Sequence, residues 1–419
     1  MRPFSTALLT AALFLPAIAA LNASAPAAPE TLLVWDNPKE DGVANYRIPQ
    51  IIVTRTGLVI ALAEARYKPG DGSQADIVIR RSRDGGKTWS KSQFIERGGP
   101  TDNHVLPGLL QDSITGRIFF FCALRGDGGI RANSTQSYYR SSDDEGVTWS
   151  EPVEVGSLLA AADLRIQAEI AAGTAPPAYA GDVGTRFNRQ HFYFGPGRAI
   201  QLSAHHPRFP GRLVVPIFLI GNQMLRLRSE RAYGDGVLLS DDQGKTWHAG
   251  NPVPLGSLGS SEVSVVELDD GRLLLNSRGA LDQLEKGLAK SAPRTLSWSS
   301  DGGETWTRPI EDNSGLPHYT ETHSGLLRVP ASDAAQPSRF LFSFPIGPGR
   351  THGMVYLSTD DHRSWIAKKL IVPGTFGYSN LDHLPDGTLL LLYEEASGAR
   401  VHLVRFSFDW LTGTDAASP

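Results

Sequence analysis

Cysteine is almost absent from this 419-residue chain, which contains a single one, Cys122. One thiol cannot form an internal disulfide, so a chain of this size must be stabilised by its hydrophobic core. Cys122 ends the apolar run IFFFC at residues 118–122. We therefore expect its side chain to be buried and to have no catalytic role.

Strong net charge and cofactor motifs are missing as well. The 40 lysines and arginines nearly balance the 44 aspartates and glutamates, for a net charge of −4. This balance gives no indication of nucleic acid or a membrane surface as a partner. We find no P-loop, no dinucleotide-binding fingerprint and no zinc-binding spacing among the eleven histidines. We therefore expect no cofactor and no metal.

Long apolar runs are confined to the N-terminus. Arg2 precedes an apolar segment at residues 7–20, and small residues follow as far as Ala25. The segment is short for a bilayer span and contains Pro16, so a cleaved secretory signal peptide is favoured over a membrane anchor. We expect residues 1–25 to be this signal peptide and the mature protein to be secreted. The sequon at Asn133 would be used only in a eukaryotic host.

Glycine and proline, in contrast, are frequent. The 43 glycines and 28 prolines exceed the roughly 7% and 5% of average proteins. Their positions follow no fixed period, which excludes a collagen-like chain. Many tight turns explain the excess, and they indicate an all-β protein.

A repeated turn motif organises the chain. Four segments fit the pattern S-x-D-x-G-x-T-W, at residues 82–89, 142–149, 240–247 and 299–306, and a fifth copy at 358–365 has His362 in place of the glycine. An aspartate that bonds turn amides, a glycine with positive φ and an anchoring tryptophan describe a structural hairpin turn. A catalytic or calcium-binding role for these aspartates is the less favoured alternative.

The spacing of the motif predicts a propeller. The five aspartates are separated by 60, 98, 59 and 59 residues, and a unit of about 60 residues accommodates a four-stranded blade. With the strand-like runs at 389–393 and 401–406, we expect six blades in one domain, residues 26–419. The strand at 31–35 would pair with the last blade and close the ring. The longer interval contains an Ala-rich stretch at 158–173, for which we expect a short helix.

Arginines, carboxylates and one tyrosine occur between the repeats in a particular order. The segments that contain them are Tyr46-Arg47-Ile48-Pro49, Ala63-Glu64-Ala65-Arg66, Asp71 in a Gly-rich loop, Ser261-Glu262, Asn276-Ser277-Arg278, Gly349-Arg350, Gly377-Tyr378-Ser379 and Glu394. This ordered set, together with the repeats, resembles the exo-α-sialidases, whose Asp-box β-propellers have these motifs in this order. The resemblance extends from residue 46 to residue 394.

The resemblance implies a retaining glycosidase. Tyr378 corresponds to the nucleophile, Glu262 to the base that activates it and Asp71 to the acid/base. Sialidases are the tyrosine-nucleophile exception among glycosidases. A neutral tyrosine suits a substrate whose own carboxylate, on the anomeric carbon, would repel a carboxylate nucleophile. Asp76 is the rival of Asp71, but it starts a strand and is expected to have a structural role.

The resemblance also implies an anion clamp. Arg47, Arg278 and Arg350 match the three arginines that bind the substrate carboxylate, and Arg guanidinium groups are planar, permanently charged donors. Arg66 matches a further substrate contact, and Glu394 matches the residue that orients Arg47. A second glutamate near Glu262, Glu267, lies five positions along the same strand and is expected to be solvated on the opposite face.

The partners implied are sialylated or Kdn-bearing glycans, bound by a monomer or weak dimer. A hydrolase for another 2-keto sugar acid such as Kdn or Kdo, and a non-catalytic glycan-binding propeller, remain alternatives. For the ring substituents we single out Asp102 as a hydroxyl contact. The polar side chains Thr101, Arg186, Arg189 and Arg198 would disfavour an acetyl methyl and tilt the preference toward Kdn.

Overall fold

The computed structural model describes residues 26–36, 42–125, 135–180, 192–220, 233–254, 260–279, 293–317, 322–331 and 336–413. The expected signal peptide, the Asn133 sequon, Arg186 and Arg189 lie outside these ranges, so these remain predictions. Among the described helices, none has both the length and the apolar character to cross a membrane.

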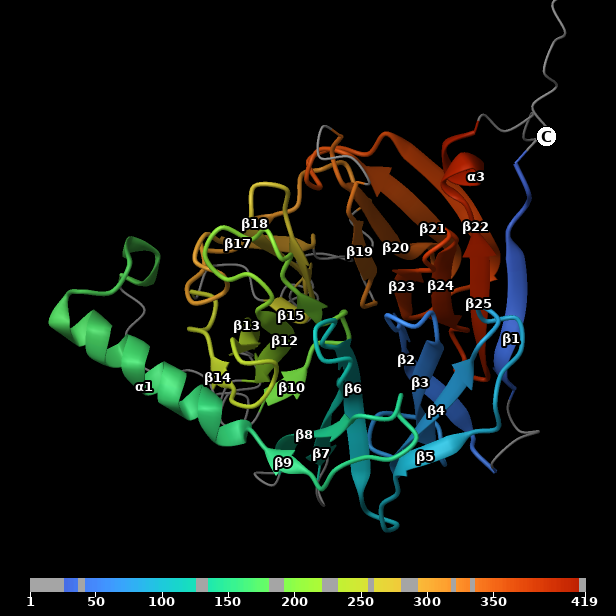
Figure 1. Ribbon diagram of the computed structural model, residues 1–419, viewed down its shortest axis with the longest axis horizontal. Helices are drawn as coiled ribbons and strands as arrows, with labels where there is room; N and C mark the ends of the chain where they lie inside the picture. Colours follow the sequence, from blue (N-terminus) through green and yellow to red (C-terminus); the bar gives the residue numbers. More distant parts are fainter. Residues whose placement is uncertain are drawn as a thin grey trace, which may run out of the picture.

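Antiparallel strands make up most of the regular secondary structure in the described residues, and Figure 1 shows the sheets arranged around a common centre. The sheet formed by both ends of the described chain contains β1 (Glu30–Asp36), β23 (Ser379–His383), β24 (Leu389–Glu394) and β25 (Arg400–Phe406). Two further four-stranded sheets contain β15 (Ser260–Glu267), β16 (Leu273–Gly279), β17 (Thr295–Ser299) and β18 (Ile310–Glu311), and β19 (Gly325–Val329), β20 (Arg339–Gly347), β21 (Thr351–Ser358) and β22 (Ala367–Thr375).

The remaining strands form two larger sheets. One has five strands, β10 (Phe192–Phe194), β11 (Ile200–Gln201), β12 (Leu213–Ile220), β13 (Tyr233–Ser240) and β14 (His248–Ala249). The other has eight, β2 (Asn45–Val53), β3 (Val59–Arg66), β4 (Ala75–Ser82), β5 (Gln93–Glu96), β6 (Asn103–Gln111), β7 (Ile118–Arg125), β8 (Gln136–Ser142) and β9 (Val153–Glu154).

The expectation of six separate blades is therefore met only in its coarser form, an all-β propeller-like arrangement. Four sheets stand alone as blades, whereas the first eight strands after β1 belong to one sheet. The first two expected blades merge into one sheet because of a single contact between them. β4 and β6 run parallel where they meet, and the single pair Ala75–Asn103 joins two runs that are otherwise antiparallel.

The ring closes as the sequence predicts. β1 pairs antiparallel with β25, from Glu30 opposite Arg405 to Asp36 opposite Arg400. The outermost strand of the last sheet is thus supplied by the start of the described chain. Such closure leaves no long unpaired edge between the first and last blades.

The repeated motif is a structural turn, as expected. In the first copy the Asp84 carboxylate accepts hydrogen bonds from the Thr88 N–H (2.9 Å) and hydroxyl (2.6 Å), and Ser82 Oγ accepts one from the Gly86 N–H (2.8 Å). The other three intact copies make the same bonds through Asp144, Asp242 and Asp301. Each motif tryptophan packs in or against a hydrophobic cluster.

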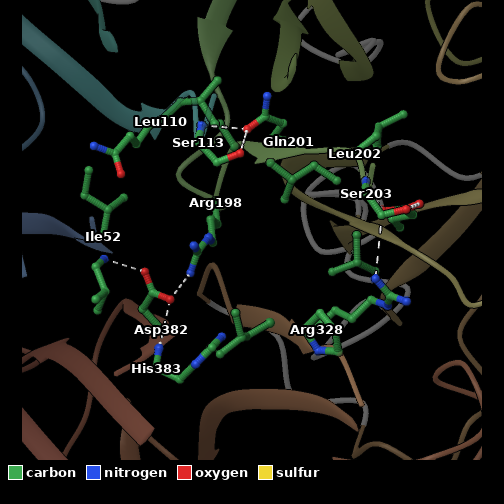
Figure 2. Close-up of a pocket in the computed structure, with 18 of the residues that line it drawn as sticks. Ile52, Leu110, Ser113, Arg198, Gln201, Leu202, Ser203, Arg328, Asp382 and His383 are labelled. Atoms are coloured by element: carbon green, nitrogen blue, oxygen red, sulfur yellow. Dashed lines mark hydrogen bonds and ion pairs between the residues drawn. The ribbon is translucent and has the colours of Figure 1, made fainter. Parts of the chain in front are cut away.

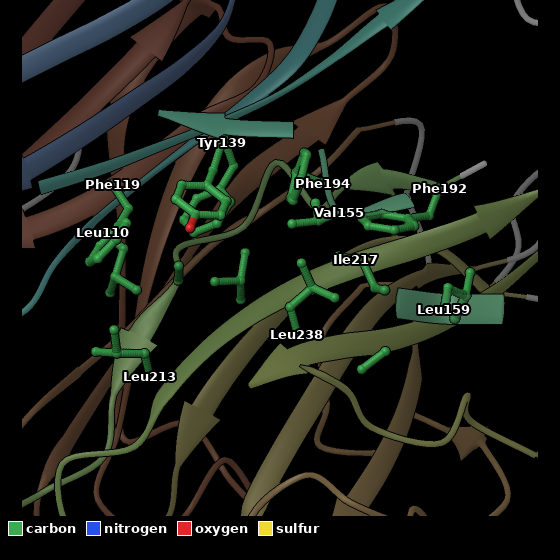
Figure 3. Close-up of a cluster of buried hydrophobic side chains, with 14 of the residues drawn as sticks. Leu110, Phe119, Tyr139, Val155, Leu159, Phe192, Phe194, Leu213, Ile217 and Leu238 are labelled. Carbon is green, nitrogen blue, oxygen red and sulfur yellow. The ribbon is translucent and has the colours of Figure 1, made fainter. Parts of the chain in front are cut away.

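The expected helix in the long interval is present as α1 (Gly156–Ala172), followed by the single 3₁₀ turn η2 (Pro177–Tyr179). Figure 1 shows α1 extending outward from the ring. Its first turns pack Leu159 and Ala162 into a hydrophobic cluster with aromatic residues of β7, β8 and β10, shown in Figure 3. A short helix, α3 (Phe408–Thr412), follows the last strand. Cys122 is fully buried, as predicted.

Candidate active site

A cavity of about 320 Å³ opens where the predicted site residues converge. Its lining comes from every sheet, and the members are Arg47, Ile48, Glu64, Arg66, Asp71, Val105, Leu106, Arg125, Phe218, Ser261, Glu262, Arg278, Arg350 and Tyr378. Seven of the nine predicted site residues are in this set. Five arginines against three carboxylates make the cavity positive, which suits an anionic ligand.

Tyr378 is held by pairing with β24. The Gly377 N–H donates to Glu394 O (2.7 Å), and the Glu394 N–H donates to Tyr378 O (3.0 Å). Gly377 is required by close approach, because a Cβ there would lie 2.8 Å from Glu394 Cγ. The backbone that precedes β23 thus fixes where the Tyr378 ring enters the cavity.

The Tyr378 hydroxyl is bound to a base. It donates a short hydrogen bond to Glu262 Oε1, while Arg278 Nη1 donates to Glu262 Oε2 (2.9 Å) and to the phenol oxygen (3.2 Å). Burial raises the pKa of Tyr378, the charge of Glu262 raises it further, and Arg278 and Arg350 oppose the increase. The phenol is therefore neutral at rest and has a proton acceptor in place.

Arg47 is oriented by Glu394, as the resemblance implies. Arg47 Nε donates to Glu394 Oε1 (2.8 Å), and the Ile48 N–H donates to Glu394 Oε2 (2.7 Å). A bulge in β2 gives Ile48 a φ of 53° and directs that N–H away from the ladder. Glu394 is fully buried, so both of its oxygens need these donors.

Arg66 is held in the same way by a residue that we did not predict. Arg66 Nε donates to Glu64 Oε2 (2.8 Å), and Glu64 Oε1 accepts from the Leu106 N–H (2.7 Å). Leu106 lies in a bulge of β6 and has a φ of 52°. Glu64 thus orients Arg66 as Glu394 orients Arg47, although Glu64 and Arg66 lie on the same strand.

Asp71 lies at the rim of the cavity, in the loop between β3 and β4. Its side chain is 72% exposed, and its Oδ1 accepts from Arg66 Nη1 (2.8 Å). Partial burial raises the pKa of Asp71, but the hydrogen bond and charge of Arg66 outweigh this effect and lower it overall. In this geometry the carboxyl is ionised at neutral pH.

The two rival carboxylates are placed elsewhere. Asp76 is buried and accepts hydrogen bonds from the Tyr67 hydroxyl (2.7 Å) and the Gly98 N–H (3.0 Å), which is the structural role expected of it. The expectation for Glu267 is wrong, because its side chain is buried rather than solvated. It accepts from both the backbone N–H (2.8 Å) and the hydroxyl (2.7 Å) of Ser203.

The structure does not bring Asp102 to the cavity. Its Oδ2 accepts from the Gly99 N–H (2.7 Å), within a turn outside the cavity lining, and the exposed Thr101 lies in the same turn. Arg198 also falls short of the site, because it forms an ion pair with Asp382 (2.5 Å). The residues chosen for ring selectivity are thus not those that line the cavity.

Arg198 and Asp382 belong to a second, larger cavity of about 480 Å³, shown in Figure 2. This cavity shares no lining residue with the first. Along β2, Ile48 lines the first cavity and Ile52 the second, so the two lie toward opposite ends of the strand. In this cavity Arg198 pairs with Asp382 and Arg328 lies near Glu267, and none of the residues predicted to act on the sugar or to bind its carboxylate lines it.

Arg125 is a site residue that sequence reasoning missed. It ends β7, is 6% exposed, and donates to the Tyr193 hydroxyl (3.1 Å) and to Asp71 O (3.2 Å). Its guanidinium also stacks 4.7 Å from the Tyr193 ring centroid. An arginine at the end of an apolar strand gives no signal in the sequence that distinguishes it from a surface residue.

The arrangement has the parts needed for an attack on a sugar acid. A hydrogen-bonded phenol and carboxylate lie beneath Arg47 and Arg350, whose guanidinium carbons are 5.8 and 5.5 Å from the Tyr378 ring centroid. A carboxyl group lies at the rim. Such a cavity can hold an anion beside a nucleophile and offer a proton donor at its edge.

Comparison with known proteins agrees with this geometry. The model of the BNR repeat-like domain family matches residues 60–391. The chain is 32% identical to a sialidase of Micromonospora viridifaciens over 393 residues, covering 89% of this chain and 53% of that protein. It is 27% identical to a sialidase of Bacteroides fragilis, covering 85% of this chain and 61% of that protein.

A solved structure is similar across the fold. The Hadza microbial sialidase Hz136 superposes with a TM-score of 0.68 at 25% identity, covering 89% of this chain and 67% of that one. The chain spans about half the length of the M. viridifaciens relative and three fifths of the B. fragilis one. On the family model the chain belongs to the BNR repeat-like domain family, and its sequence and propeller-like fold are similar to those of sialidases.

Proposed function

We propose that this chain is an exo-α-sialidase that releases terminal sialic acids from glycoconjugates with retention of configuration. The observation that carries the proposal is the hydrogen-bonded Tyr378–Glu262 pair in a cavity with five arginines. The relatives named sialidases support it. Arginine suits the substrate because its guanidinium binds carboxylates in two-point contacts.

The proposed reaction has two steps. In the first, Glu262 takes the phenol proton while the Tyr378 oxygen forms a bond to the anomeric carbon. The bond to the leaving group breaks, and Asp71 protonates the departing oxygen. In the second, Asp71 takes a proton from water, which attacks the anomeric carbon, and the tyrosyl oxygen leaves and recovers its proton from Glu262.

Release of 4-methylumbelliferone from its α-sialoside tests this function. A sialidase releases the fluorophore, whereas a non-catalytic glycan-binding propeller leaves the substrate uncleaved. A panel that includes the Kdn and Kdo glycosides separates a sialidase from a hydrolase of another 2-keto sugar acid. Turnover of the Kdo glycoside alone would overturn the proposal.

We also propose that six blade-like groups of strands surround the site, each of which contributes at least one residue to the cavity. Both halves of the eight-stranded sheet contribute to the cavity, through Arg47 on β2 and Val105 on β6. The four other sheets contribute as well, through Phe218, Glu262, Arg350 and Tyr378. Six groups of strands therefore converge on one cavity, although two of them share a sheet.

Replacement of Arg350 by alanine should weaken the binding of a dehydrated sialic acid analogue by about 10- to 100-fold. This range corresponds to the roughly 1.5–3 kcal/mol of a hydrogen bond that involves charged groups. Arg350→Lys should recover only part of the loss, because the two-point geometry is missing. Inhibition constants measured for both variants check the prediction. An unchanged constant in Arg350→Ala would remove this residue from the clamp.

Preference among sialic acids is a separate question. The polar residues on which a tilt toward Kdn depends lie outside the cavity or outside the described ranges, whereas Val105, Leu106 and Phe218 line it. Apolar surface favours an acetyl methyl. We expect the N-acetylneuraminic acid glycoside to be cleaved with a kcat/KM at least equal to that of its Kdn counterpart. A several-fold advantage of the Kdn glycoside would support the tilt predicted from the sequence.

A further inference from the structure

The loop that presents Asp71 has little support of its own. Residues 68–72 are all exposed, and a Cβ added at Gly70 or Gly72 would meet nothing within 4 Å. Within the described ranges, residues 68–73 make no backbone–backbone hydrogen bond. A general acid must lie within hydrogen-bond reach of the oxygen that it protonates. The position of Asp71 must therefore be fixed from outside the loop.

Two buried side chains hold the Asp71 backbone from outside. Asn103 Nδ2 donates to the Asp71 carbonyl oxygen (2.9 Å), and Arg125 Nη1 donates to the same oxygen (3.2 Å). Asn103 begins β6, Arg125 ends β7, and the two are directly opposite in the register of that strand pair. They are 5% and 6% exposed. Because a carbonyl oxygen has two lone pairs, these two donors use its full capacity.

The Asn103 side chain makes only this one hydrogen bond among the described residues. Its Oδ1 is buried and accepts none. A buried polar atom without a partner costs stability, so the fold alone gives no reason for an amide at this position. Asn103 does not line the cavity, and its contact with the site is the one through Asp71.

Arg125 is itself fixed by aromatic side chains. Its Nε donates to the Tyr193 hydroxyl (3.1 Å), and its guanidinium carbon lies 4.7 Å from the Tyr193 ring centroid. The Tyr193 ring stacks on Phe218 in turn, with the centroids 5.3 Å apart. This support holds the plane of the guanidinium group, so that Nη1 points to the Asp71 carbonyl.

The carbonyl contacts differ in kind from the contact to the carboxyl group. Arg66 Nη1 donates to Asp71 Oδ1 (2.8 Å), and such a charge-assisted bond weakens when the carboxyl takes up a proton. Asp71 must be protonated before it can protonate a leaving oxygen. The bonds to the carbonyl do not depend on the state of the carboxyl. They can therefore hold the loop in both protonation states.

We propose that Asn103 and Arg125 are positioning residues that hold the Asp71 carbonyl and thereby aim its carboxyl group at the leaving oxygen. The inference rests on the proposed function, because it assigns both residues to the proton transfer of that reaction. The single pair Ala75–Asn103, which joins the first two expected blades, comes directly after this loop. The contact that merges the two blades thus also anchors the loop.

Asn103→Leu tests the proposal, because it removes the donor and changes no charge. For a natural sialoside kcat/KM should fall by about 10- to 100-fold, since a misplacement of about 1 Å can cost that much. For an aryl sialoside it should fall by less than about threefold, because this leaving group needs little protonation. Arg125→Gln should show the same difference between the two substrates. If Asn103→Leu does not fold, Asn103→Ala removes the same donor with a smaller side chain.

A double variant separates this role from a structural one. In Asp71→Asn the acid is already missing, so the addition of Asn103→Leu should cost nothing further with the natural sialoside. Losses that add, or losses in Asn103→Leu that are equal for both substrates, would overturn the proposal.

Arg212→Gln is the matched control for Arg125→Gln. Arg212 is buried, its Nη1 donates to the Gly302 carbonyl oxygen (3.0 Å), and its guanidinium carbon lies 3.7 Å from the Phe209 ring centroid. It does not line the cavity. Its replacement should lower the stability of the protein and leave the ratio of the two kcat/KM values unchanged.

Loop mobility gives a second readout, which needs no turnover. The Gly72 amide, next to Asp71, can be labelled with ¹⁵N-glycine and assigned through Gly72→Ala, and its heteronuclear NOE reports motion on the nanosecond timescale. The NOE should fall in Asn103→Leu and Arg125→Gln but not in Arg212→Gln. A fall in a protein that releases no sialic acid would keep the loop anchor and remove only the proposed function. An unchanged NOE in Asn103→Leu, with both substrates turned over as in wild type, would overturn the inference and leave the proposed function intact.

Discussion

Tyr378→Phe should lower kcat by roughly 10³-fold or more while the protein stays folded, because the change removes the attacking oxygen and keeps the ring. The ring packs near His323 and beneath two guanidinium groups, so its shape is retained in phenylalanine. The loss should be the same for every leaving group, because none can be displaced without the nucleophile. Single-turnover rates with an aryl sialoside measure it.

Tyr393→Phe is the control for this experiment. Tyr393 is a buried tyrosine on β24 that stacks on Phe376 and does not line the cavity. Loss of its hydroxyl should leave kcat unchanged. A Tyr378→Phe enzyme with near-wild-type turnover and a normal melting temperature would show that another group attacks the sugar.

Asp71→Asn should lower kcat/KM by about 10²–10⁴-fold for natural glycosides, the usual range for general acid catalysis. Aryl sialosides should lose much less, because their leaving group needs little protonation. Because the Asp71 side chain is exposed, its replacement should leave the fold intact, so the loss would not arise from unfolding. Asp76→Asn, which alters a buried structural contact, should affect both substrates equally. Equal losses in Asp71→Asn would assign the acid to another residue.

The Arg66 contact gives this prediction a pH dependence. A general acid must be protonated, and the hydrogen bond and charge of Arg66 outweigh partial burial to lower the pKa of Asp71. The protonated fraction therefore falls as the pH rises through that lowered value. We expect kcat/KM for natural glycosides to decrease from acidic toward neutral pH, and that for aryl sialosides to decrease less.

The sequence predicts the repeated turn motif and the closure of the ring well. The turn motif depends on bonds within eight residues, such as those of Asp84 to Thr88, and these can be read from the pattern alone. Closure by β1 follows from an unpaired apolar strand at one end of the fold. The order of the site residues was readable only through resemblance to a family, because spacing by itself does not show which loops meet.

What the sequence does not predict is what depends on contacts between distant segments. Glu64 and Arg125 lie in strands whose sequences resemble those of ordinary core or edge strands. Only the convergence of the blades brings these two residues to the cavity. Asp102 fails for a related reason. In its short loop the Asp102 carboxylate accepts a hydrogen bond from the Gly99 N–H, three residues away. This local bond holds the side chain in the turn and away from the cavity.

The pairing of β1 with β25 has a consequence for the order in which the protein is made. The sheet that contains Tyr378 and Glu394 needs strands from both ends of the described chain, and Arg400 bonds Asp36 across 364 positions. A ribosome that has synthesised five sixths of the chain has not yet produced the partner of β1. Contacts so distant along the chain also make folding slow. The nucleophile should therefore acquire its complete surroundings only after β25 has been synthesised and has paired with β1.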